Sequence, residues 1–345
     1  FGRIVEQIDE IGASTKYTYD EFGNRDSITD ALGNVTQITY NEFHQPTSMT
    51  DPSGATWKRE YNGRRLLSAS VNPLGARWQF EYDSGGNPIR ITDPQGFVRT
   101  LRYENGMLRE ETDFLGHVTS YKWDPFGRLV ERIGPIGDVT CFRYDPSGNL
   151  VSVAQPDGTC VLASYDSGDN LSSYTDANGS CQTYRYGPCG RLLKRSDALG
   201  HTTHYEWGTE PDRLLAVVNE KKERYLYIYD TEGRMVEEIS FDGRHHQFTY
   251  DAAGNCSSFI NGNGECIRYK HDLLGRLVEE TLPTGEKAVF AYDPVGRMVG
   301  GTNADSQVEF KYDPTGLLIQ ETQDKEWVRK EYNKSGELIH VTTSL

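Results

Sequence analysis

The stretch Tyr19-Asp-Glu-Phe-Gly-Asn-Arg-Asp-Ser-Ile-Thr-Asp-Ala-Leu-Gly-Asn-Val-Thr-Gln-Ile-Thr-Tyr40 is one unit of a repeat. A ring-bearing residue, usually followed by Asp or Asn, recurs along the chain, and we call each such position an anchor. Of the fifteen gaps between anchors, eleven are 21 residues, three are 20 and one is 22. The anchors are Tyr19, Tyr40, Tyr61, Tyr82, Tyr103, Trp123, Tyr144, Tyr165, Tyr186, Trp207, Tyr229, Tyr250, His271, Tyr292, Tyr312 and Tyr332. A repeat of this kind predicts one extended array over residues 1–345, with no separate domain.

Each unit contains two turn signals, which in the first unit are Asp20–Gly23 and Asp30–Gly33. Asp in the first place of a turn can accept hydrogen bonds from the turn backbone, and Gly in the fourth place accepts a positive φ. A turn closed by such a Gly typically joins two strands of a hairpin with a bulge. Each repeat is therefore predicted to be two strands joined by two tight turns.

The segments between turns alternate apolar and polar residues, as in Tyr17-Thr18-Tyr19. This period of two indicates antiparallel strands with one apolar face. Sixteen repeats predict an all-β fold, a continuous antiparallel hairpin ribbon of about 32 strands. Because long sheets twist, we expect the ribbon to curl into a spiral or partial hollow shell with its aromatic face on one side.

The composition excludes several classes of function. The net charge is −15, which disfavours nucleic acid and anionic membrane surfaces, since both attract basic proteins. The apolar runs are short, so no membrane insertion is expected, and no signal peptide is visible. Mean hydropathy is −0.66, and the 21 tyrosines are expected to supply much of the buried surface.

The six cysteines are predicted to be buried free thiols. Cys160 and Cys181 occupy the same place in adjacent repeats, which puts them two strands or ~9.5 Å apart. A disulfide requires Cα atoms within about 7 Å, so this pair is not expected to bridge. The remaining cysteines are Cys141, Cys189, Cys256 and Cys266. Free thiols fit synthesis in a reducing cytosol, and disulfides are the alternative.

The repeats resemble the tyrosine-aspartate (YD) repeats of the rearrangement-hot-spot (Rhs) family. The pattern Tyr-Asp-x-x-Gly-Arg-Leu returns nearly unchanged in Trp123–Leu129, Tyr229–Met235, His271–Leu277 and Tyr292–Met298. The family includes bacterial polymorphic toxins, the B and C subunits of insecticidal toxin complexes, and teneurins. The resemblance implies a β-sheet ribbon that spirals into a hollow shell, which in the bacterial members encloses a C-terminal toxin domain.

The function that the resemblance implies is structural. We expect a shell segment that encapsulates a toxin for delivery by a bacterial secretion system, either type VI or toxin-complex-like. The expected partners are the remainder of the same polypeptide, with its other repeats and the toxin domain, and a secretion-spike or adaptor protein. The protein would be made in the bacterial cytoplasm and then secreted or delivered to target cells.

The number of repeats limits how much of a shell this chain can form. About 32 strands at ~4.8 Å spacing make a ribbon covering on the order of 3,800 Å², whereas a shell around a toxin domain of about 130 residues needs about 6,000 Å². The chain starts within a turn and ends within a strand-like stretch, so we expect a fragment of a longer shell wall. Exposed strand edges would then favour edge-to-edge self-association.

No motif predicts catalysis, a metal or a cofactor. Asp313-Pro-Thr-Gly-Leu317 resembles the opening of the self-cleavage segment of bacterial family members, but it lies on the repeat period and is interpreted as a turn. His201 and His204 are three apart in a strand, where they point to opposite faces. Asp166–Asn170 lacks the later Glu of a calcium loop. The chain is therefore not expected to be an enzyme.

Two features leave other interpretations open. Five Asn-x-Ser/Thr sequons would suit an extracellular adhesion or glycan-binding array of the teneurin kind. The stretch Trp207–Arg213 lacks the turn glycine and opens the longest repeat, and Asn219–Arg224 lacks it too. If the wall carries a flap, corner or contact surface, it is expected there; a plain loop insertion is the alternative.

Overall fold

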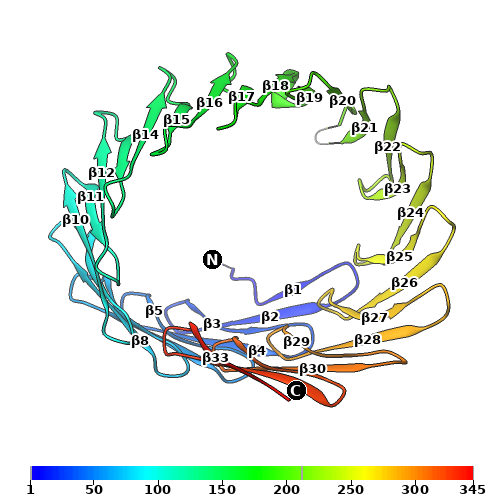
Figure 1. Ribbon diagram of the computed structural model, residues 1–345. Helices are drawn as coiled ribbons and strands as arrows, with labels where there is room; N and C mark the ends of the chain where they lie inside the picture. Colours follow the sequence, from blue (N-terminus) through cyan, green and yellow to red (C-terminus); the bar gives the residue numbers. More distant parts are fainter. Residues whose placement is uncertain (1, 211–212, 345) are drawn as a thin grey trace. The chain divides into compact units, whose positions relative to one another are not determined.

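The computed structural model describes residues 2–210 and 213–344. These residues form 33 strands in one antiparallel sheet, and their helical structure is a 3-10 turn at Pro188–Gly190. The prediction of an all-β antiparallel ribbon is confirmed, with one strand more than the expected number. Strands that follow one another in sequence pair with one another, so the ribbon is a meander of hairpins (Figure 1).

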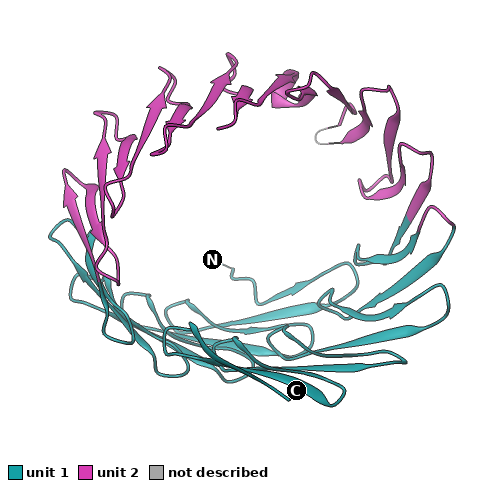
Figure 2. Cartoon of the chain, viewed as in Figure 1, with its two compact units in different colours: residues 1–98, 248–260, 264–345 teal, residues 99–247, 261–263 magenta. Residues whose placement is uncertain are grey.

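The chain divides into two compact units, residues 1–98, 248–260 and 264–345, and residues 99–247 and 261–263 (Figure 2). The strands of the first unit are β1 (Glu6–Ile8), β2 (Ser14–Tyr19), β3 (Arg25–Thr29), β4 (Val35–Tyr40), β5 (Pro46–Thr50), β6 (Thr56–Tyr61), β7 (Leu67–Val71), β8 (Arg77–Tyr82), β9 (Pro88–Thr92), β25 (Cys256–Ile260), β26 (Cys266–His271), β27 (Leu277–Thr281), β28 (Lys287–Tyr292), β29 (Met298–Thr302), β30 (Gln307–Tyr312), β31 (Leu318–Gln323), β32 (Glu326–Tyr332) and β33 (Leu338–Thr343).

The second unit is an unbroken run of hairpins. Its strands are β11 (Met107–Thr112), β12 (Val118–Trp123), β13 (Leu129–Ile133), β14 (Val139–Tyr144), β15 (Leu150–Ala154), β16 (Cys160–Tyr165), β17 (Leu171–Thr175), β18 (Cys181–Tyr186), β19 (Leu192–Ser196), β20 (Thr202–Trp207), β21 (Leu214–Val218), β22 (Arg224–Tyr229) and β23 (Met235–Ile239). The strands β10 (Val98–Glu104) and β24 (His245–Tyr250) each have residues in both units.

The turns have the geometry that the sequence predicts. In the turn between β2 and β3, Asp20 N–H donates to the Asn24 carbonyl at 2.9 Å and Gly23 N–H donates to the Asp20 carbonyl at 3.0 Å. Gly23 has φ of 90°, a conformation that costs a side-chain-bearing residue energy. The register shifts between Thr18 and Tyr19, so a β-bulge lies beside the anchor. Equivalent bulges lie beside other anchors, such as Trp123 and Tyr144. Because bulges increase local twist, they twist the ribbon along its length.

The hydrophobic core of the ribbon is thin. The buried apolar residues are small ones, Ala13, Ala55, Ala69, Ala76 and Ala216, and no large side chain among the described residues is fully buried. The anchors are half-buried, as the tyrosine-rich composition predicts, whereas the residue before each of them, such as Thr18, is exposed. Stability must therefore come from the backbone ladders and from side chains that join one hairpin to the next.

Two distant stretches of the ribbon meet within the first unit. Turn residues that follow β5 and β7, such as Ser53 and Pro73, line the same cleft as Asp313 and Pro314, which follow β30. Farther along, Gln95 Nε2 lies 3.2 Å from Ser335 Oγ, a contact between residues 240 positions apart. Leu74 likewise shares a cavity with Leu317 and Ile339. The turns after β5, β7 and β9 accordingly lie near the turns after β30 and β32.

All six cysteines are free thiols, as predicted, but the expectation that they are buried is wrong. Cys181 and Cys189 are exposed and the other four are half-buried. Cys181 is the first residue of β18, on the polar face of a sheet that has no second layer. Cys189 lies at a turn with φ of 61°.

After Trp207, Gly208 N–H donates to the Arg213 carbonyl at 2.8 Å, a hydrogen bond that joins the end of β20 to the residue before β21. Pro211 and Asp212, part of the region expected to hold a flap or contact surface, lie outside the described residues. The next turn is regular although it lacks Gly, because Lys222 takes the positive φ of 66°.

Candidate functional site

The repeats are joined at one end of each hairpin by side chains, where the backbone ladder stops. Between β27 and β28, three residue pairs are in register, and the ladder ends at Glu279 and Val289. The last residues of β28, which include the anchor Tyr292, pair with β29 instead. The hairpin that ends with β27 and the hairpin that begins with β28 therefore separate beyond this point, toward the turns that follow β26 and β28. Any link between the two hairpins in that region must be made by side chains.

The anchor supplies the first link. Tyr292 donates its hydroxyl proton to the Leu277 carbonyl, at the start of β27, over 2.8 Å. Trp123 does the same through Nε1, which lies 2.7 Å from the Leu108 carbonyl. The described anchors with such a bond, each to the carbonyl 14 or 15 residues earlier, are Tyr19, Tyr40, Tyr61, Tyr82, Trp123, Tyr144, Tyr165, Trp207, Tyr229, Tyr292, Tyr312 and Tyr332. The side chain that recurs with the repeat period is thus the one that forms a hydrogen bond between neighbouring hairpins.

The Asp after the anchor holds the turn in shape. Asp272 Oδ1 accepts the backbone N–H of Leu274 at 2.9 Å and of Arg276 at 3.1 Å. Its other oxygen, Oδ2, accepts Arg276 Nε at 2.7 Å. Both side chains are more than four-fifths buried, so this charge-assisted bond is well shielded from water.

The Arg that the Asp orients supplies the second link. The guanidinium carbon of Arg276 lies 4.9 Å from the ring centre of Tyr292, and Nη1 donates to the Asp293 carbonyl at 3.3 Å. A cation over an aromatic face is attractive. Equivalent triplets are Asp124–Arg128–Tyr144 and Asp293–Arg297–Tyr312. We call this group of carboxylate, bridging residue and next anchor the joint.

Several of the turn aspartates have a lowered pKa, among them Asp113, Asp124 and Asp166. For Asp124, the leading cause is the hydrogen bond from the Arg128 backbone N–H, burial opposes it, and the Arg128 side chain adds to the lowering of the pKa. For Asp166 and Asp113, hydrogen bonds from turn backbone N–H groups are again the leading cause of a lowered pKa.

This pattern predicts unfolding in acid. A carboxylate whose pKa is lower in the folded state contributes stability above its unfolded pKa, and that stability is lost as the pH falls through the folded value. We therefore expect the urea midpoint to be level from pH 7 to pH 5 and to fall steeply below about pH 4. Circular dichroism during a urea titration at each pH measures the midpoint. An equal midpoint at pH 5 and pH 3 would contradict the role given to the turn carboxylates.

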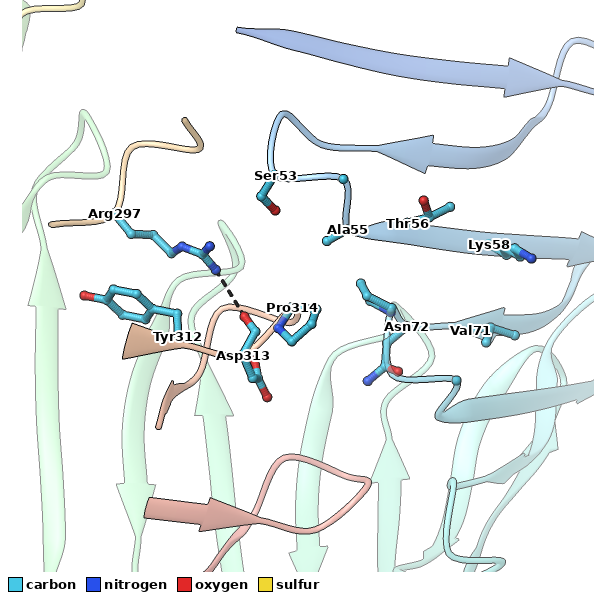
Figure 3. A pocket seen from close by; sticks show the side chains of 13 residues that line it. Ser53, Ala55, Thr56, Lys58, Val71, Asn72, Arg297, Tyr312, Asp313 and Pro314 are labelled. Atoms are coloured by element: carbon cyan, nitrogen blue, oxygen red, sulfur yellow. Dashed lines mark hydrogen bonds between the residues drawn. The ribbon is translucent and has the colours of Figure 1, made fainter. Parts of the chain in front are cut away.

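A cleft of about 610 Å³ lies where the two stretches of the first unit meet (Figure 3). Ser53, Asn72 and Lys58 line it from one stretch, and Arg297 and Asp313 from the other. Arg297 already donates to the Asp313 carbonyl, as the dashed line shows. The lining combines turn residues with side chains of β6, β7 and β30.

His201, which was considered above as a metal ligand, has a structural partner, because its Nδ1 lies 2.9 Å from Asp197. His204 is exposed on β20. His245 and His246 contact Glu237 and Glu238. Asp166 forms an ordinary turn. In residues 2–210 and 213–344, no three His, Cys, Asp or Glu side chains are grouped as a metal would require.

Asp313–Leu317 is likewise a turn, as interpreted, because Asp313 Oδ1 accepts the N–H groups of Thr315 and Leu317. Among the described residues, no helix has the length and apolar character needed to cross a bilayer.

Two family models match the sequence. The RHS Repeat model matches residues 1–35, 27–56, 60–98 and 250–287, and the Teneurin YD-shell model matches residues 115–257. The chain belongs to the Rhs/YD-repeat family. The resemblance that the sequence motifs indicate is thus confirmed. No curated protein matches the chain.

Solved toxin-complex structures share the fold of this Rhs/YD chain. The crystal structures of TcdB2-TccC3-Cdc42 and of TcdB2-TccC3 without its hypervariable C-terminal region each match with a TM-score of 0.79 and 15% identity, over 97% of this chain and 22% of theirs. A Photorhabdus luminescens Tc holotoxin pore matches with a TM-score of 0.57 and 14% identity, over 96% of this chain and 19% of that one. The chain thus spans about a fifth of these relatives.

Proposed function

We propose that this Rhs/YD array is a wall segment of a shell that encloses a C-terminal toxin domain for delivery by a bacterial secretion system, of the type VI or toxin-complex kind. The observation that carries the proposal is the continuous antiparallel ribbon, whose fold is that of the TcdB2-TccC3 structures over 97% of its length. In this proposal the array is a single structural domain without catalysis, and the protein leaves the bacterial cytoplasm for a target cell.

The joints suit a wall. Side-chain bonds join the hairpins where the backbone ladder stops, so the ribbon stays continuous across its width. The proposed partners are the rest of the same polypeptide and a spike or adaptor protein. The outer side of β33, where Leu338, Ile339 and Val341 are exposed, is proposed to pair with another strand edge, including that of a second copy.

Limited proteolysis of the natural full-length protein tests encapsulation. A protease that cleaves unfolded chains should leave the segment after the array intact under native conditions and should cleave it once acid or urea opens the ribbon. The same segment expressed alone, in an unfolded state, is the control for cleavability. Cleavage of the segment at the same rate in the native protein and in the control would refute enclosure.

A second candidate is an extracellular adhesion or glycan-binding array. The match of residues 115–257 to the Teneurin YD-shell model favours it. This function predicts glycans on the sequons at Asn34, Asn170, Asn178, Asn255 and Asn333. Mass spectrometry of native material decides between the two functions: unmodified sequons support the shell, and occupied sequons support adhesion.

A further inference from the structure

His271 is the only anchor among the sixteen that is neither Tyr nor Trp, and its imidazole does not make the bond to an earlier carbonyl that Tyr292 and Trp123 make. Its side chain is 13% exposed, and the buried Nδ1 has no hydrogen-bond partner. A buried polar atom without a partner costs about 1–3 kcal/mol of stability, so this position calls for an explanation.

The joint at His271 also lacks its arginine. In the triplet Asp272–Arg276–Tyr292 the bridging residue is a permanent cation, which pairs with the turn carboxylate and lies over the anchor ring. The equivalent residue before His271 is Asn255, which donates its amide to Asp251 Oδ2 at 3.2 Å. Asp251 therefore has no arginine partner at this joint, and its oxygen Oδ2 lies 3.9 Å from His271 Nδ1.

We propose that the joint formed by Asp251, Asn255 and His271 is a proton-binding joint, which tightens when His271 is protonated and loosens when it is neutral. Joints with a bridging arginine carry a permanent cation, and joints with a bridging asparagine, such as Asn24 and Asn149, carry none there. At this asparagine joint the anchor itself can carry the cation, which then depends on pH. Imidazole is the side chain that changes charge between pH 5 and pH 8. Protonation turns the unpartnered Nδ1 into a donor that faces a carboxylate, and a small rotation brings the two within bonding distance.

The ionisable groups around His271 keep one charge state between pH 5.5 and pH 7.5. Burial opposes ionisation of Asp251, but hydrogen bonds from Asn255 and Ala253 and the charge of His271 lower the pKa of Asp251, so its carboxylate is ionised in this range. From β25, burial raises the pKa of the Cys256 thiol, which stays neutral. From the turn after β26, Asp272 is paired with Arg276. Tyr269, on the same strand, has a raised pKa for the same reason of burial.

Hydrogen exchange at single-residue resolution tests the proposal in the protein as it exists. Amides of β25 and β26 should be protected about threefold to tenfold more at pH 5.5 than at pH 7.5 after correction for intrinsic exchange, because a hydrogen bond between the protonated imidazole and Asp251 stabilises the joint by about the free energy of one such bond. The response of β28 and β29 in the same sample is the internal reference. Equal protection of β25 and β26 at the two pH values would overturn the joint.

Two variants separate a proton switch from a general acid effect. His271→Tyr restores the common anchor, whose hydroxyl can reach the Cys256 carbonyl as that of Tyr292 reaches the Leu277 carbonyl. In this variant the amides of β25 and β26 should be protected equally at both pH values. Asp251→Asn keeps the turn, because Asn62 accepts the same two backbone N–H bonds in its own turn. This second variant should reverse the response, since a protonated His271 would then be buried without a carboxylate.

The matched control is His204→Gln, at an exposed histidine of β20, which should keep the wild-type response. A response that persists in His271→Tyr, or that has the same sign in Asp251→Asn as in the wild type, would refute the proposal.

Discussion

Replacing Tyr292 with alanine is expected to lower the free energy of unfolding of the surrounding repeats by about 3 kcal/mol, near the lower end for large aromatic truncations because the ring is half-buried. The variant loses the bond to the Leu277 carbonyl and removes the ring that Arg276 covers. In a ribbon with few buried large side chains, no second layer can fill the space. Urea denaturation, with hydrogen exchange at β27 and β28, measures the loss.

Tyr292→Phe is the matched control for the hydroxyl. It keeps the ring and the cation above it, so it should lose only the value of one hydrogen bond, about 1 kcal/mol. A phenylalanine variant as unstable as the alanine variant would mean that the hydroxyl bond, and not the ring, carries the joint. An alanine variant as stable as the wild type would refute the role of the anchor altogether.

Asp272→Ala is expected to cost about 2 kcal/mol, the upper end of the range for loss of a side chain that caps backbone N–H groups. Leu274 and Arg276 lose their acceptor, and Arg276 loses the carboxylate that holds it over Tyr292. Thermal or urea unfolding measures the change. Because the two residues belong to one joint, the double variant Asp272→Ala/Tyr292→Ala should lose less than the sum of the single losses.

Asp272→Asn is the informative control. Asn fills the same turn place at position 62 and accepts the same N–H bonds, so the turn should survive while the charge on Arg276 goes unpaired. Its loss should lie between those of the wild type and the alanine variant. Simple addition in the double variant would show that turn and anchor stabilise the ribbon independently.

The sequence predicts the repeat, its turns and its strands because these depend on residues close in sequence. Asp20 and Gly23 satisfy their turn with neighbours only, and alternation in Tyr17–Tyr19 sets the face of each side chain. The anchor positions are therefore found by spacing alone. Spacing does not show that the hydroxyl of Tyr292 binds a carbonyl 15 residues back, since this requires the ladder between β27 and β28 to end early.

The bridging arginine and the meeting of distant stretches were not predicted, for related reasons. Arg276 follows the turn glycine as a pattern residue, but its contact with Tyr292 depends on how the bulges twist one hairpin against the next. The contact of Gln95 with Ser335 joins residues 240 positions apart, which no local pattern in the sequence encodes. His271 is predicted as an anchor, but only the packing around it shows an unpartnered nitrogen.

The early end of the ladder between hairpins has a mechanical consequence. Pulling the chain from one end would break the backbone bonds of one hairpin and then the few side-chain bonds of the next joint, in regular alternation. Such a ribbon yields one repeat at a time, and each step releases about 21 residues, or roughly 70 Å of extended chain. The wall would therefore unravel as a series of similar small events, and the force at each event would be set by the joint that holds that repeat.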